Sequence, residues 1–156
     1  MTALTDPLAE GAVQAVLAAG RLLADPAAVR SIRSKSETDY VTNVDLAVQE
    51  FLRERLAALA PDVQFMGEEQ DNSALDLTRP CWILDPVDGT TNLIHQFQHS
   101  AISLALAEGG QIVFGVVYNP YTEECFIARR GGGAFRNGVS IQVSAVSRLE
   151  DSLLSA

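Results

Sequence analysis

The stretch WILDPVDGTTN, residues Trp82 to Asn92, passes directly from apolar to acidic side chains. Its first three residues are typical of a buried strand. Asp85 and Asp88 follow in what reads as a tight turn leading into Gly89. We therefore predict a core strand that presents two carboxylates at its end, an arrangement that favours a cation, or a phosphate held by a cation.

Two further segments place carboxylates where this site could use them. Glu68 and Glu69 follow a short apolar strand after a glycine. Asp39 and Asp45 flank the start of a helix predicted over 44–60. If the two strands are neighbours, their acidic ends lie side by side, and several close carboxylates cannot all stay ionised without a cation. Such oxygen ligands suit Mg²⁺, Mn²⁺ or Ca²⁺ and do not choose among them.

Two common loops that bind calcium or phosphate do not match this sequence. An EF-hand loop needs a D-x-D-x-D-G order and a glutamate at its twelfth position, where counting from Asp85 gives Gln96. The sequence contains no GxxxxGK[ST] phosphate loop, and Gly131 to Gly133 lie between predicted strands rather than before a helix. Acidic residues at strand ends are often simply solvated, and each acidic segment taken alone leaves that alternative open.

Composition limits the class of protein. The chain has 156 residues, a formal net charge of −9 and 47% hydrophobic residues, as expected of one soluble globular domain. The acidic balance without a Lys/Arg-rich run argues against nucleic acid as a partner. No apolar run is long enough to span a membrane. Cys81 and Cys125 lack metal-ligand spacing and are too few for a disulfide framework, so a reduced, cytoplasmic setting is expected.

Hydrophobic periodicity predicts two helices followed by strands. The first helix begins at Asp6, where a proline follows, and extends to about Ala24; the second covers 44–60. Residues 30–43 between them are predicted to form a loop or a short hairpin. Strands are predicted over 63–66, 81–84, 102–106, 112–118, 124–128, 134–135 and 141–143, with tight turns at Gly109-Gly110 and Asn137-Gly138. Two helices and a mostly antiparallel sheet make an α+β fold.

Three motifs together resemble one family. FMGEE, WILDPVDGTTN and GVVYNP…GGGAFRNG…IQVS are similar to the inositol monophosphatase family, within the fructose-bisphosphatase-like superfamily of Mg²⁺-dependent sugar phosphatases. KSETDYVTNVD is similar to the family's segment before the second helix, so the resemblance covers about 35–144. It implies that the helices and sheet form the N-terminal domain of the αβαβα sugar phosphatase fold.

The resemblance also implies metal ligands. Glu68, Asp85 and the backbone carbonyl of Val87 would bind a first, catalytic metal ion. Asp85 would bridge to a second ion that Asp88 also binds. Glu69 would hold a water molecule on the metal and a weaker third ion. Glu68, Val87 and Asp88 would line the substrate site as well.

A water-orienting pair and a phosphate site are implied too. Asp45 would accept a hydrogen bond from the Thr90 hydroxyl, so that this hydroxyl can orient the attacking water. Gly89 and Thr90 would open a short helix whose N–H groups face the substrate phosphate, a role that helix N-termini favour on physical grounds. Structural or surface roles are expected for His95 and His99.

The expected activity is Mg²⁺-dependent hydrolysis of a small phosphate monoester, inositol monophosphate first, by metal-activated water. Mn²⁺ is an alternative cofactor, and Li⁺ and Ca²⁺ are expected to inhibit by family resemblance. Fructose 1,6-bisphosphate, 3′-phosphoadenosine 5′-phosphate and histidinol phosphate are rival substrates. A non-catalytic metal- or phosphate-binding or dimerisation module is the alternative class. The expected partners are a small phosphorylated metabolite and a second copy of the chain in a homodimer.

The family's chains are nearly twice as long as this one. Residues 1–147 are therefore expected to form an N-terminal domain, and 148–156 to begin a C-terminal α/β domain. In the family a W-D-x-A-type motif of that domain supplies a further aspartate to the second metal. We accordingly expect this chain alone to fold but to hydrolyse phosphate esters poorly, and 149–156 to be disordered or to pack against another copy.

Overall fold

The computed structural model describes residues 6–25, 27–34 and 40–153. Helix α1 (Asp6–Ala24) comes first, and strands β1 (Ile32–Ser34) and β2 (Tyr40–Thr42) then form a small antiparallel sheet before helix α2 (Asn43–Leu59). Both predicted helices and the predicted hairpin are confirmed. No helix in these ranges is both long enough and apolar enough to cross a membrane.

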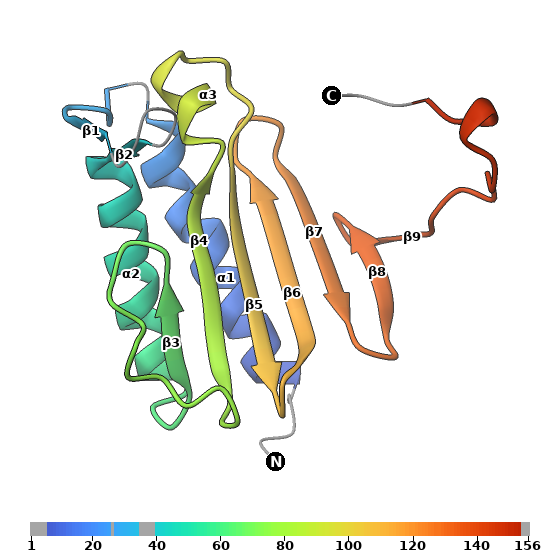
Figure 1. The fold of residues 1–156 in the computed structure, drawn as a ribbon, viewed down its shortest axis with the longest axis horizontal. Coiled ribbons are helices and arrows are strands. Elements are labelled where there is room, and N and C mark those ends of the chain that lie inside the picture. Colours follow the sequence, from blue (N-terminus) through green and yellow to red (C-terminus); the bar gives the residue numbers. More distant parts are fainter. Residues whose placement is uncertain (1–5, 26, 35–39, 154–156) are drawn as a thin grey trace.

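A seven-stranded sheet follows (Figure 1). Its strands are β3 (Gln64–Gly67), β4 (Cys81–Asp88), β5 (Ala101–Glu108), β6 (Gln111–Asn119), β7 (Glu124–Arg129), β8 (Gly133–Arg136) and β9 (Val139–Ile141), and they lie in the sheet in chain order. β3 and β4 are parallel, whereas every other neighbouring pair is antiparallel. A short helix, α3 (Thr90–Ile94), connects β4 to β5. The predicted mostly antiparallel α+β fold is confirmed.

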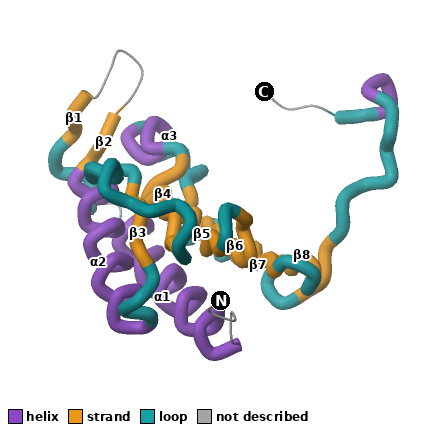
Figure 2. Tube along the Cα trace, turned by 60° about the horizontal axis from the view of Figure 1, so that its bottom comes forward, coloured by secondary structure: helices purple, strands orange, loops and turns teal. Residues whose placement is uncertain are grey.

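The core lies between the sheet and the two long helices, which Figure 2 shows on the same side of the sheet. Alternate residues of the central strands point into it, among them Trp82, Leu84, Leu104 and Phe114, each at most 3% exposed. The rings of Trp82 and Phe114 meet edge to face with 6.4 Å between centroids. Burying each such side chain contributes on the order of 1.5–3 kcal/mol, so this layer is the main source of stability.

Strand β4 is longer than predicted. It was expected to end at Leu84, but its pairing with β5 continues through Asp85, opposite Ser103, to Asp88, opposite Ala101. Between these two pairs β4 has one residue more than β5, which is a β-bulge. The bulge accommodates a proline, which cannot donate a ladder hydrogen bond. The predicted tight acidic turn is therefore wrong: the carboxylates lie on a bulged strand end.

The last strand also begins earlier than predicted. β9 covers Val139–Ile141 rather than 141–143, because it starts directly after the turn at Asn137 and Gly138. Both turn residues have positive φ, 49° and 80°, as a two-residue hairpin turn requires. After β9 the chain extends away from the sheet (Figure 1). It forms a single 3₁₀ turn at Leu149–Asp151, and Leu153 is 99% exposed. Packing of this segment on another copy stays a prediction.

Candidate functional site

Parallel pairing of β3 with β4 brings two acidic segments together. Gly67, the last residue of β3, is the register partner of Leu84. Because the strands run in the same direction, Glu68 leaves the sheet at the same edge where Asp85 continues β4. The two strands are thus neighbours, the case in which their acidic ends were expected to lie side by side.

A cavity of ≈ 260 Å³ opens at this edge. Its lining residues are Tyr40, Glu68, Asp85, Val87, Asp88, Gly89, Thr90 and Thr91. Six of these were predicted site residues, so the structure gathers the proposed metal and phosphate positions around one opening. Tyr40 and Thr91 were not predicted, although both lie within or beside the quoted motifs. Asp39 lies outside the described residues.

Asp85 is the most strongly perturbed acid in this cavity. Burial, followed by the negative charges of Glu68 and Asp88 and by a side-chain hydrogen bond with Glu68, raises its pKa from 3.8 to about 7. The Val87 N–H, which donates to Asp85 Oδ1 at 3.2 Å, acts in the opposite direction on this pKa. With its pKa at about 7, the Asp85 carboxyl is partly protonated near neutral pH.

The chemistry of these donors fits a hard divalent cation, since carboxylate and carbonyl oxygens are its preferred ligands. Within the described ranges, however, no three His, Cys, Asp or Glu side chains are grouped so that they could hold an ion together. The side-chain hydrogen bond between Glu68 and Asp85 is one of the causes of the raised pKa of Asp85.

Asp45 and Thr90 form the predicted pair. The Thr90 hydroxyl lies 3.1 Å from Asp45 Oδ1 and 3.0 Å from the Val87 carbonyl. Asp45 is only 1% exposed, and its Oδ2 accepts hydrogen bonds from the Thr42 backbone N–H (2.8 Å) and hydroxyl (2.6 Å). The Thr42 hydroxyl also accepts from the Val44 N–H, completing a capping box at the start of α2. The helix cap and the support of Thr90 therefore share one carboxylate.

The turn into α3 is tightly packed around Gly89. Its φ is 86°, and a Cβ there would lie 3.0 Å from the His99 carbonyl oxygen, so glycine is needed. The Ser100 hydroxyl donates to the Gly89 carbonyl at 2.8 Å, and the Asn92 side-chain amide donates to the His99 carbonyl at 2.7 Å. The side chains of His95 and His99 are exposed, as expected for surface roles. That the Gly89 and Thr90 N–H groups face a substrate phosphate stays a prediction.

Glu69 is set back from the cavity. It is not among the lining residues, and its backbone N–H donates to Gln49 Oε1 at 2.9 Å. Neither Thr42 nor Gln49 was predicted to take part. The Thr42-x-x-Asp45 spacing is a capping-box signal that could have identified the first. Nothing local marks Gln49, because its contact is with a strand that lies later in the chain.

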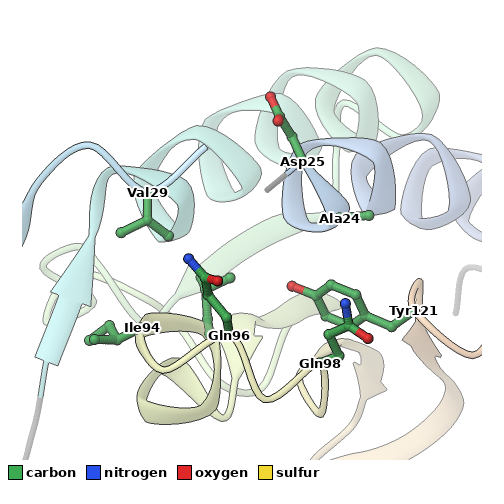
Figure 3. A pocket seen from close by; sticks show the side chains of 8 residues that line it. Ala24, Asp25, Val29, Ile94, Gln96, Gln98 and Tyr121 are labelled. Atoms are coloured by element: carbon green, nitrogen blue, oxygen red, sulfur yellow. The ribbon is translucent and has the colours of Figure 1, made fainter. Parts of the chain in front are cut away.

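A second cavity, of ≈ 230 Å³, lies beside the C-terminal end of α1 (Figure 3). Its lining includes Asp25, Gln96, Gln98 and Tyr121, and the Tyr121 hydroxyl donates to the Leu23 carbonyl at 3.0 Å. Asp25 is the one acid among its lining residues and points away from the other labelled side chains (Figure 3). The acidic cavity at the end of β3 and β4 is therefore the better candidate site.

Known proteins resemble this chain in sequence and in fold. The profile of the inositol monophosphatase family matches residues 4–156. The inositol-1-monophosphatase of Rhizobium meliloti is 41% identical over 145 residues, which cover 91% of this chain and 54% of that protein. Extragenic suppressor protein suhB from Bartonella henselae superposes with a TM-score of 0.85 at 37% identity, covering 92% of this chain and 56% of the other.

An IMPase/NADP phosphatase complexed with Mg²⁺ and phosphate superposes with a TM-score of 0.72 at 33% identity, over 77% of this chain and 46% of that one. The chain thus spans about half the length of the relatives it matches. The family match runs through both helices, the whole sheet and the acidic cavity. The chain belongs to the inositol monophosphatase family.

Proposed function

We propose that this chain supplies the metal- and phosphate-binding part of a Mg²⁺-dependent phosphatase that hydrolyses inositol monophosphate. The observation that carries the proposal is the convergence of Glu68, Asp85 and Asp88 on one cavity. The Asp45–Thr90 hydrogen bond lies directly at its wall. Enzymes named as inositol monophosphatases at about 40% identity support the substrate class.

The residues that would hold the cations follow from the donor set. Glu68, Asp85 and the Val87 carbonyl would bind one ion, and Asp85 with Asp88 a second. Glu69 would act from outside the cavity through water. When bound, a divalent cation would acidify a water molecule and offset the charge of the phosphate. A solved relative that carries Mg²⁺ and phosphate supports Mg²⁺ as the ion.

Asp45 and Thr90 would orient the attacking water. The Thr90 hydroxyl has one proton, and a carboxylate such as that of Asp45 is a stronger acceptor for it than the Val87 carbonyl. With that proton donated to Asp45, the hydroxyl oxygen keeps lone pairs that can accept a hydrogen bond from water. Asp45 is held in place by Thr42, so the direction of these lone pairs is fixed before substrate binds.

The second half of a longer protein would complete the site. Because relatives are about twice as long, we expect a further carboxylate from residues beyond 148–156 and weak activity of this chain alone. The N-terminal domain over 1–147, a homodimer and a cytoplasmic location stay predictions. Fructose 1,6-bisphosphate, 3′-phosphoadenosine 5′-phosphate and histidinol phosphate are the rival substrates, and a non-catalytic binding module is the rival class.

Two measurements test the proposal. Titration calorimetry with Mg²⁺ and Mn²⁺ at pH 8 should detect binding to the chain that inorganic phosphate strengthens. Phosphate release from inositol 1-phosphate should require Mg²⁺ and should be weak for this chain. The full-length Rhizobium meliloti relative, assayed under identical conditions, provides the comparison. Absence of metal binding would rule out the proposed site. If the chain binds metal but phosphate is released faster from a rival substrate, the proposed site stands and the rival is the substrate.

A further inference from the structure

Helix α2 buries two polar side chains one turn apart on the face toward the sheet. Asp45 is 1% exposed and Gln49 is 7% exposed. Four residues of spacing place both on one side of the helix, next to the core residues Val48 and Leu52. A buried polar group is costly unless it is hydrogen-bonded, so each of these side chains needs a specific partner.

The two side chains find partners on different strands. Asp45 accepts from Thr90, just after β4. Gln49 accepts from the backbone N–H of Glu69, just after β3, at 2.9 Å. One rigid helix thus contacts both acidic segments of the candidate site. The two acidic segments lie far apart in the chain, and their hydrogen bonds to the same helix fix their positions relative to each other.

The contact with β3 is unusually close. A Cβ built on Gly67 would lie 2.4 Å from Gln49 Oε1 and 2.6 Å from its Cδ, so a larger residue would displace the amide. On the same turn, the Asn72 side-chain amide donates to the Gly67 carbonyl at 2.7 Å. Two side-chain amides therefore hold the backbone immediately before and after Glu68.

We propose that Gln49 is a positioning residue for the metal site, through its hydrogen bond to the Glu69 backbone. This inference rests on the proposed function. The Gln49 amide does not reach the cavity, and it acts by fixing the turn on which Glu68 faces Asp85. Groups that orient metal ligands in this indirect way typically change metal affinity 10- to 100-fold when they are lost. A neutral amide does so without adding a further negative charge beside Glu68.

The test compares Gln49→Met, which keeps the length of the side chain but removes the acceptor, with Gln49→Glu, which keeps an acceptor. In the metal-free chain, NMR hydrogen exchange should show the Glu69 amide exchanging about tenfold faster in Gln49→Met and near the wild-type rate in Gln49→Glu. Mg²⁺ affinity by calorimetry should fall about tenfold in Gln49→Met. Gln14→Met, the same change at an exposed position of α1, should alter neither quantity.

Gly67→Ala is a second route to the same effect, because its methyl group would displace the Gln49 amide. It should also speed exchange at Glu69, and it decides the question if Gln49→Met does not fold. Unchanged exchange at Glu69 in the folded variants would overturn the inference. So would an unchanged Mg²⁺ affinity in Gln49→Met, provided that the wild-type chain binds Mg²⁺. If wild type binds no metal, the proposed function fails, and with it the metal-positioning role, whereas the exchange result still reports whether Gln49 holds the turn.

Discussion

The side of the large sheet that contains β3 and β4 and the side that contains β8 and β9 differ in what supports them. Trp82 and Leu84 of β4 are 1% and 3% exposed, and α2 packs against this strand. Val139 and Ile141 of β9 are 69% and 36% exposed, and Figure 1 shows β8 and β9 extending beyond both helices. The predicted chemistry gathers at the supported end. Side chains can be held in a defined geometry only where the residues behind them are packed.

The largest expected effect tests this difference directly. Leu84→Ala should lower the free energy of unfolding by about 2–5 kcal/mol, because it leaves a cavity between the sheet and α2. Val139→Ala should change it by no more than about 0.5 kcal/mol, because that side chain is already exposed. Urea unfolding of both variants provides the comparison. Similar losses would mean that the two ends of the sheet are equally supported.

Mg²⁺ bound at the ends of β3 and β4 should raise the free energy of unfolding, and this effect should not depend on the exposed segment after β9. At 100 times its Kd, Mg²⁺ would add roughly 2.7 kcal/mol to the free energy of unfolding, or roughly 5–10 °C in Tm. Asp85→Asn should abolish this rise, because Asp85 is shared by both proposed ions. Asp151→Asn, in the exposed 3₁₀ turn, should retain it. A full Mg²⁺ response in Asp85→Asn would show that the ion binds elsewhere.

The pH dependence of the metal-free chain should report the same carboxylates. Between about pH 4 and 7, the folded chain keeps a proton on Asp85 that the unfolded chain has released. Unfolding then releases a proton, so the free energy of unfolding should fall as pH rises through this window. The difference between wild type and Asp85→Asn isolates the effect of this group. A difference that does not change with pH would contradict the raised pKa.

The smallest effect concerns the helix cap. Thr42→Val should lower the free energy of unfolding by about 1 kcal/mol, because the Val44 N–H loses its acceptor. Thr42→Ser keeps the hydroxyl and should be close to wild type. Thermal unfolding of the two variants is sufficient to compare them. If valine and serine have equal effects, the hydroxyl is not what stabilises the start of α2.

Local pattern predicted the helices, the succession of strands along the chain and the carboxylates that follow β3 and β4. It did so because apolar periodicity depends on residues that are close in the chain, whereas the parallel pairing of β3 with β4 had been left open. It failed at the end of β4, where Asp85 and a proline look like a turn. The strand continues there because β5 supplies Ser103 and Ala101 as partners, and those partners come later in the chain.

Gln49 could not be recognised for a related reason. On a helix, a glutamine next to the exposed Glu50 looks like one more solvated residue. Its burial depends on β3 packing closely enough for Gly67 to touch it, which is a property of the assembled fold. Side-chain chemistry was enough to predict the class of cation, whereas the raised pKa of Asp85 depends on its burial and on how close Glu68 and Asp88 lie in space.

The double use of Asp45 has a consequence for how the site is lost. Its carboxylate caps the first turn of α2 through Thr42 and at the same time orients Thr90. Fraying of the first helical turn would therefore release Thr90 in the same event. The opening free energy of that turn sets an upper limit on the fraction of time for which the Thr90 hydroxyl stays aligned. Local melting of the helix and loss of alignment would be a single cooperative transition.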